Sequence, residues 1–243
     1  MTTELLYGIN TITNILEQTP ESVVEIFVSN TVNNRINNLI VTAKTYGIAI
    51  QKIKKSNLEK MLRDSEARHQ GIIAKCKLKP VTTDLLGFIK DKQDIFLLIL
   101  DGVQDPHNLG ACLRSADAFG VTAVVIPRNN AAQITSSVRK VASGAAENVN
   151  IIAVSNLART LEQLKTAGVW LVGLDATADK ALQQIDLQGN IALILGSEAK
   201  GMSSLTRKHC DYLAALPMCG VVSSLNVAVA AGISLFEATR QRS

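Results

Sequence analysis

The chain has 243 residues, 47% of them hydrophobic and 19% charged, and its formal net charge is +4. This composition excludes a disordered chain and predicts a globular protein with one domain or two unequal ones. No apolar run reaches the roughly 18 residues of a membrane span, and the N-terminus lacks the pattern of a secretory signal. We therefore expect a cytoplasmic protein.

The cysteines predict neither disulfides nor a metal site. They form no CxxC pair and no metal-like spacing with histidine, which favours reduced, mostly buried thiols. The four positions are Cys76, Cys112, Cys210 and Cys219.

The first part of the chain, residues 1–76, reads as a small α/β unit. Helices are expected over residues 9–16, 34–46 and 57–62, and strands over 23–28, 48–52 and 71–76. Residues 44–79 hold ten Lys or Arg against three Asp or Glu. Such a basic segment suggests contact with a polyanion, nucleic acid first, although a solvated lysine-rich surface would have the same composition.

Residues 77–94, with a proline and mixed charge, predict a linker that carries one amphipathic turn or helix. Apolar strand candidates then alternate with helical stretches, which predicts a parallel sheet covered on both faces. The candidates are IFLLILD, AVVIP, VWLVGLD, IALILG and LAALPM. Ligands of such sheets lie beyond the carboxyl ends of strands, so the loops after Asp101, Leu195 and Met218 are candidate sites.

The first of these loops, DGVQDPHNLGACLRSADAFG, predicts a helix over residues 109–119 that ends at Gly120. Asn108 stands at its start and Arg114 in its middle, among small side chains. Both could reach the strand ends. They could equally be an ordinary N-cap and an ordinary surface arginine.

The second loop, LILGSEAKGM, has two glycines at the spacing of a phosphate-binding P-loop. A P-loop needs Lys and then Ser or Thr after the second glycine, whereas Met202 follows here, and Glu198 would repel a polyphosphate. ATP binding is therefore not predicted. No GxGxxG follows any strand, which argues against an ordinary dinucleotide fold and the usual glycine-rich methyltransferase fold.

The third loop, LPMCGVVSSLNVAVAAGISLFEATR, predicts a helix that begins near Leu225 and is capped by Ser223 or Ser224. Its small residues suit tight internal packing or a subunit interface. Asn226 would lie in the first turn, at the ligand end, where it could also merely support the cap.

Taken together and in this order, NLGACLR, LILGSEAKGM and LPMCGVVSSLNVAVAAGISLFEA resemble the three motifs of the SpoU (TrmH-like) RNA ribose 2′-O-methyltransferases. LLYGINTI and HQGIIAK are similar to the small RNA-binding domain of members that methylate a guanosine in the peptidyl-transferase loop of 23S rRNA during ribosome maturation. The ending LFEATRQRS is similar as well.

This resemblance implies an α/β fold whose C-terminal parallel-sheet domain holds a deep trefoil knot, a rare exception to unthreaded chains. It implies an RNA-binding domain over 1–76, a linker over 77–94 and a knotted methyltransferase domain over 95–243. It also implies a homodimer packed through the knotted domain, 23S rRNA as the partner, and S-adenosylmethionine as methyl donor without a metal.

Site residues follow from the same resemblance. Backbone around Gly196, Leu216 and Leu225 would hold the adenosine portion of the cofactor. Arg114 would be the base or activator of the ribose hydroxyl, with the substrate and Arg114 arranged by Asn108, Glu198, Ser224 and Asn226.

A role for Arg114 as a general base requires an unfavourable deprotonation of its guanidinium. With an arginine pKa of about 12.5 to 13.8, a neutral guanidine at pH 7 costs roughly 7 to 9 kcal/mol. We therefore favour a phosphate clamp and a stabiliser of the developing alkoxide, with proton acceptance late in the step left open. Two alternatives remain: a non-enzymatic RNA-binding or ribosome-assembly factor, and tRNA instead of rRNA as substrate.

Overall fold

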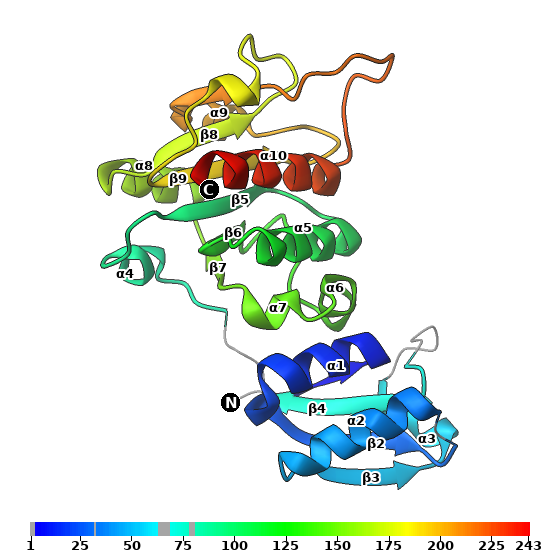
Figure 1. Ribbon diagram of the computed structural model, residues 1–243. Coiled ribbons are helices and arrows are strands. Elements are labelled where there is room, and N and C mark those ends of the chain that lie inside the picture. Colours follow the sequence, from blue (N-terminus) through cyan, green and yellow to red (C-terminus); the bar gives the residue numbers. More distant parts are fainter. Residues whose placement is uncertain (1–2, 32, 63–68, 78–80) are drawn as a thin grey trace. The chain divides into compact units, whose positions relative to one another are not determined.

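A computed structural model describes residues 3–31, 33–62, 69–77 and 81–243 (Figure 1). The chain forms two compact units. The first contains Met1–Pro80 and Ile134–Asn148, and the second contains Val81–Gln133 and Val149–Ser243. The domain boundaries at residues 76 and 94 stay a prediction.

The first unit contains a four-stranded sheet in the order β1-β4-β2-β3. Strand β4 runs antiparallel to β1 and β2, whereas β3 runs parallel to β2. The strands are β1 (Thr3–Tyr7), β2 (Val23–Ser29), β3 (Ala49–Ile53) and β4 (Ile72–Lys77). The three predicted strands are present, and β1 was not predicted.

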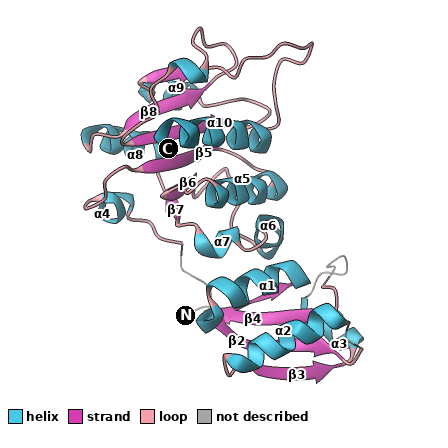
Figure 2. Ribbon diagram, viewed as in Figure 1, coloured by secondary structure: helices cyan, strands magenta, loops and turns pink. Residues whose placement is uncertain are grey.

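Helices cover both faces of this sheet (Figure 2). The larger core joins α1 (Ile9–Gln18) and α2 (Asn34–Thr45) to one face, and a smaller cluster around Leu58 joins α3 (Lys55–Leu62) to the other. A short 3-10 turn, Pro20–Ser22, precedes β2. The Asn33 Oδ1 accepts a hydrogen bond from the Ile36 amide at 2.9 Å and so caps α2.

Two short helices from later in the chain also belong to the first unit. They are α6 (Ser136–Ala142) and α7 (Ala145–Asn148), and α6 contacts β1. Arg139 of α6 and Glu147 of α7 form a buried ion pair. Burial raises the pKa of Glu147, although Arg139 opposes the shift.

The second unit contains a six-stranded sheet in the order β10-β8-β9-β5-β6-β7, in which every pairing is parallel. This confirms the predicted parallel sheet. The strands are β5 (Phe96–Asp101), β6 (Ala123–Pro127), β7 (Ile151–Val154), β8 (Trp170–Leu174), β9 (Ile191–Gly196) and β10 (Tyr212–Ala214). Only β7 had no predicted counterpart.

Both faces of the second sheet are covered (Figure 1). On one face α5 (Pro106–Ala118) and α10 (Val227–Arg242) pack against each other. On the other, α4 (Leu85–Ile89) and α8 (Leu157–Thr166) bury a core around Leu97 and Ile194, and α9 (Ser204–His209) contacts α8. Helix α4 lies within the predicted linker. Among the described residues no helix is long and apolar enough to cross a membrane.

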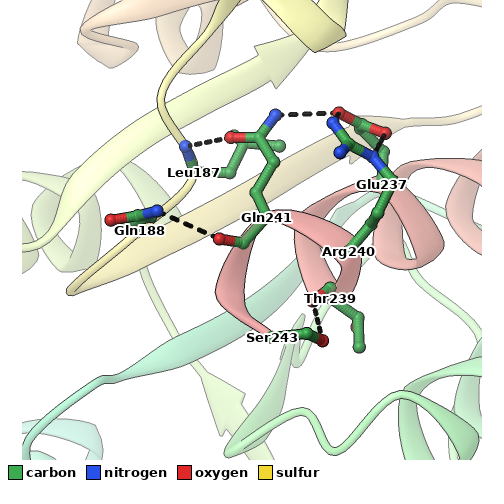
Figure 3. A network of polar contacts seen from close by, with 7 residues as sticks. All are labelled: Leu187, Gln188, Glu237, Thr239, Arg240, Gln241 and Ser243. Atoms are coloured by element: carbon green, nitrogen blue, oxygen red, sulfur yellow. Dashed lines mark hydrogen bonds and ion pairs between the residues drawn. The ribbon is translucent and has the colours of Figure 1, made fainter.

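Polar contacts fasten the C-terminal end of α10 to the loop before β9 (Figure 3). The Leu187 amide donates to Gln241 Oε1 at 3.0 Å, and Gln241 Nε2 donates to Glu237 Oε1 at 2.8 Å. Arg240 donates two hydrogen bonds to the same carboxylate, at 2.8 and 2.9 Å. These bonds lower the pKa of Glu237 to about 2.

Candidate active site

A cavity of about 240 Å³ opens at the carboxyl ends of β8 and β9. Its remaining walls are the loop after β10 and the first turn of α10. All three predicted cofactor residues line it, together with two of the predicted catalytic residues. These five are Gly196, Leu216, Leu225, Glu198 and Ser224. The position at strand ends is the one that the parallel sheet predicted.

The loop with the two glycines folds back on itself at the cavity wall. Ser197 and Gly201 exchange two backbone hydrogen bonds of 3.1 and 2.8 Å. A Cβ added to Gly196 would lie 1.9 Å from the Gly201 carbonyl carbon and 2.0 Å from the Met202 nitrogen. Gly201 itself has φ +65°, a conformation that favours glycine. The two glycines therefore let this loop close tightly and present Glu198.

Three predicted side chains, from three different segments, meet beside the cavity. The Asn108 Nδ2 donates to Glu198 Oε1 at 2.6 Å, and the Asn226 Nδ2 donates to Asn108 Oδ1 at 3.0 Å and to Glu198 Oε1. Glu198 is thus the shared acceptor of two amide donors. Such bonds to an ionised acceptor are stronger than neutral ones and fix the orientation of all three side chains.

Asn226 also determines where α10 begins. Its Oδ1 accepts hydrogen bonds from the amides of Ala228 and Val229 at 2.9 and 3.4 Å. The prediction that Ser223 or Ser224 caps a helix from Leu225 is wrong, because α10 begins at Val227 with Asn226 as N-cap. The same amide side chain therefore holds both the helix and Glu198.

Arg114 does not belong to this hydrogen-bonded cluster among the described residues. It is exposed in the middle of α5, six residues beyond Asn108, and within the described chain it has no hydrogen bond or ion pair with the cluster. Helix α5 begins three residues before the predicted residue 109, because Asp105 and not Asn108 is its N-cap, with its carboxylate accepting a hydrogen bond from the His107 amide at 2.9 Å. The role of Arg114 stays a prediction.

The loop after β8 is a part of the site that the sequence analysis missed. Leu174, Asp175 and Ala176 line the cavity. Burial acts to raise the pKa of Asp175, but hydrogen bonds from Thr177 and the charge of Arg207 outweigh it and lower the pKa. The signal was present, since VWLVGLD ends in an acid after an apolar strand, as IFLLILD does.

The cysteines take no part in this arrangement. Burial raises the pKa of Cys76, Cys112 and Cys210 to about 12, so these thiols stay neutral. Cys219 is exposed in the loop after β10. In the described ranges, no three His, Cys, Asp or Glu side chains come together as a metal site would require.

Comparison with known proteins assigns the class. The model of the SpoU rRNA methylase family matches residues 95–236, and a model for RNA 2′-O ribose methyltransferase substrate binding matches residues 5–81. The chain belongs to the SpoU rRNA methylase family. It is similar over nearly its whole length to 23S rRNA (guanosine-2′-O-)-methyltransferases RlmB. The identity is 47% with that of Escherichia coli strain K12 and 48% with that of Photorhabdus laumondii, covering 99% of each chain in both cases.

Solved structures have the same fold. The SpoU methyltransferase AviRb of Streptomyces viridochromogenes matches with a TM-score of 0.78 and 26% identity, over 99% of this chain and 90% of that one. AviRb in complex with its cofactor AdoMet matches with a TM-score of 0.79 and 24% identity, over 98% and 90%. The TrmH/SpoU tRNA modifying enzyme of A. aeolicus covers 62% of this chain and 76% of its own, with a TM-score of 0.55 and 29% identity.

Proposed function

We propose that this chain transfers a methyl group from S-adenosylmethionine to the ribose 2′-hydroxyl of a guanosine in 23S rRNA. The observation that carries the proposal is the cluster of Asn108, Glu198 and Asn226 beside the cavity of a SpoU-family fold. RlmB relatives of nearly the same length support the choice of rRNA and guanosine. The nucleotide would lie in the peptidyl-transferase loop and be modified as the ribosome matures.

The cavity is chemically suited to the methyl donor. Gly196, Leu216 and Leu225 line it. Gly196 has no side chain, so its backbone would be accessible to the adenosine portion of the cofactor. When bound, the cofactor supplies an electrophilic methyl group on a sulfonium cation. The carboxylate of Glu198 is compatible with that cation, whereas it would repel the triphosphate of ATP.

The residues of the chain would position the nucleophile and stabilise its charge. The side-chain amides of Asn108 and Asn226 hold the Glu198 carboxylate, which would orient the substrate. Ser224 lines the same cavity. Arg114 is free of partners within the described residues, so its guanidinium is available to a phosphate and to the developing alkoxide. A cationic donor at the developing alkoxide would stabilise its negative charge. Positioning of the hydroxyl against the methyl group supplies much of the rest.

We further propose a homodimer formed through the C-terminal, knotted domain. Helix α10 exposes Val229, Ile233 and Phe236, which are four and then three residues apart and therefore share one face. About half of each side chain is exposed, at 49%, 45% and 58%. An apolar face of this kind is typical of a subunit interface. A trefoil knot in this domain and a cytoplasmic location belong to the same proposal.

The two parts of the chain would divide the work. Residues 1–76 would select the RNA, and residues 95–243 would bind the cofactor and catalyse transfer. The ranges of the two family models, 5–81 and 95–236, support this division. The cavity and the cluster also lie wholly in the second unit.

The test is methyl transfer with purified components. The chain is incubated with methyl-tritiated S-adenosylmethionine and 23S rRNA or tRNA, and the RNA is digested to nucleosides. We expect label in 2′-O-methylguanosine from 23S rRNA. Label on a base, or on tRNA alone, would contradict the substrate assignment. RNA binding with no label in any RNA would favour the assembly factor.

A further inference from the structure

Charge is segregated between the two edges of the sheet in the first unit. Because β4 is antiparallel to β1 and β2 while β3 is parallel to β2, strands β1, β2 and β3 all end at one edge, at which β4 begins. We name this the strand-end edge. The described residues between positions 3 and 77 place five cations and one acid there. They are Arg35, Lys52, Lys54, Lys55, Lys60 and Glu59.

The opposite edge has another balance. Among residues 3–77, the described charges near it are Glu4, Glu17, Glu21 and Glu25 against Lys44, Lys75 and Lys77, and the paired Arg139 and Glu147 add one charge of each sign. The four acids outnumber the three cations among those residues, whereas the strand-end edge has an excess of four positive charges. The basic character of the first unit is therefore a property of one edge rather than of its whole surface. A uniformly solvated lysine-rich surface would not have this asymmetry.

All five cations of the strand-end edge are exposed. Arg35, Lys52, Lys54, Lys55 and Lys60 make no ion pair or side-chain hydrogen bond within the described ranges. Like charges held together without neutralisation repel one another, which costs free energy in the protein alone. A polyanion would remove that cost and release its own counterions on binding.

Two helices add to the positive field at the same edge. Helix α2, of 12 residues, starts after β2, and α3, of 8 residues, starts after β3. Helix N-termini carry partial positive charge and unsatisfied amide donors. Arg35 is the second residue of α2, and Lys55 is the first of α3. Cationic side chains and helix ends thus point to one kind of ligand, a chain of phosphates.

We propose that the strand-end edge of the first unit binds the phosphate backbone of the rRNA substrate. This rests on the proposed function and deepens it by naming the surface that holds the RNA. The substrate supplies the polyanion, and the range 5–81 that matches the substrate-binding family model includes the whole edge. Contacts to phosphates position the RNA, and they carry no sequence information by themselves.

The test compares two double variants of the full-length chain that remove the same charge from opposite edges. Lys54→Gln/Lys55→Gln alters the strand-end edge, and Lys44→Gln/Lys77→Gln is the matched control. The dissociation constant for a 23S rRNA fragment is measured between 50 and 200 mM salt. Loss of two phosphate contacts should weaken binding and reduce the slope of log K against log salt by roughly 1.4 to 1.8. The control should match the wild type, and both variants should keep wild-type circular dichroism.

The outcomes separate this surface from the proposed function. If the wild type binds and methylates rRNA while the strand-end variant keeps its affinity and salt slope, the surface is wrong and the function stands. An equal loss in the control variant would also overturn the surface assignment. If the wild type neither binds nor methylates rRNA, the proposed function and the proposed RNA-binding surface are both refuted. Weaker binding with an unchanged kcat at saturating RNA supports the assignment, because the edge lies outside the cavity and cluster.

Discussion

Gly196→Ala is the most revealing single change at the site. The added Cβ would lie 1.9 Å from the Gly201 carbonyl carbon, whereas ordinary carbon contacts are about 3.5 to 4.0 Å. The obstacle is backbone, so the conflict is relieved only when the loop moves by roughly 1.6 Å. Overpacking costs typically about 1 to 3 kcal/mol. We expect about 3 kcal/mol, because no side chain can rotate away.

Two assays check this expectation. The thermal midpoint of the second unit should fall by about 6 to 12 °C, at 2 to 4 °C for each kcal/mol. Calorimetry should show S-adenosylmethionine binding weakened at least about tenfold, equivalent to 1.4 kcal/mol. Gly220→Ala, in the loop after β10, is the control, since a Cβ there meets no atom within 4 Å. Wild-type stability and cofactor affinity in Gly196→Ala would refute the reasoning.

Three further predictions concern the cluster, the arginine and the end of α10. Asn226→Ala removes a helix cap and should cost about 1 kcal/mol, whereas Asn226→Asp keeps a capping oxygen but sets a second carboxylate against Glu198. Methyl transfer should therefore fall in both variants, whereas denaturant titration should show a loss of stability mainly in Asn226→Ala. Equal stabilities of the two variants would contradict the capping role. Arg114→Ala should abolish transfer yet leave cofactor affinity unchanged in calorimetry, and Arg114→Lys should also be poor, because a point charge cannot replace a planar fork; near-normal turnover in either would refute the role. Glu237 has its pKa lowered to about 2, so its stabilisation is present above pH 4.5 and lost as the pH falls towards 2. Urea titrations across that window should show a shallower loss of stability for Glu237→Gln than for the wild type, and identical pH profiles would contradict the assignment.

Much of the second sheet could be predicted because its strands are buried on both faces. Runs such as IALILG have no polar alternation, and β9 matches that run residue for residue. β1 and β7, of five and four residues, had no predicted counterpart. Strand β1 pairs with β4 about 70 residues later, with Leu6 opposite Ala74. No local pattern encodes such a pairing.

Three of the predicted site residues meet in the structure, but their contacts could not be predicted. Motif order identified Asn108, Glu198 and Asn226 as belonging to one site, and the structure joins them by hydrogen bonds. The sequence offered Ser223 and Ser224 as caps because serine and asparagine are equally good at that position. Asn226 is used instead, and its amide also reaches Asn108 and Glu198. A tertiary contact of this kind cannot be read from local propensity.

The central claim is that this chain methylates a ribose 2′-hydroxyl of a guanosine in 23S rRNA. The most direct measurement is primer extension at low dNTP on 23S rRNA from cells that lack the chain, before and after the gene for the wild type or Arg114→Ala is supplied. We predict that one stop at a guanosine in the peptidyl-transferase loop is absent without the chain, returns with the wild type and stays absent with Arg114→Ala. A pattern of stops that does not depend on the chain, or that returns equally with both forms, would contradict the account.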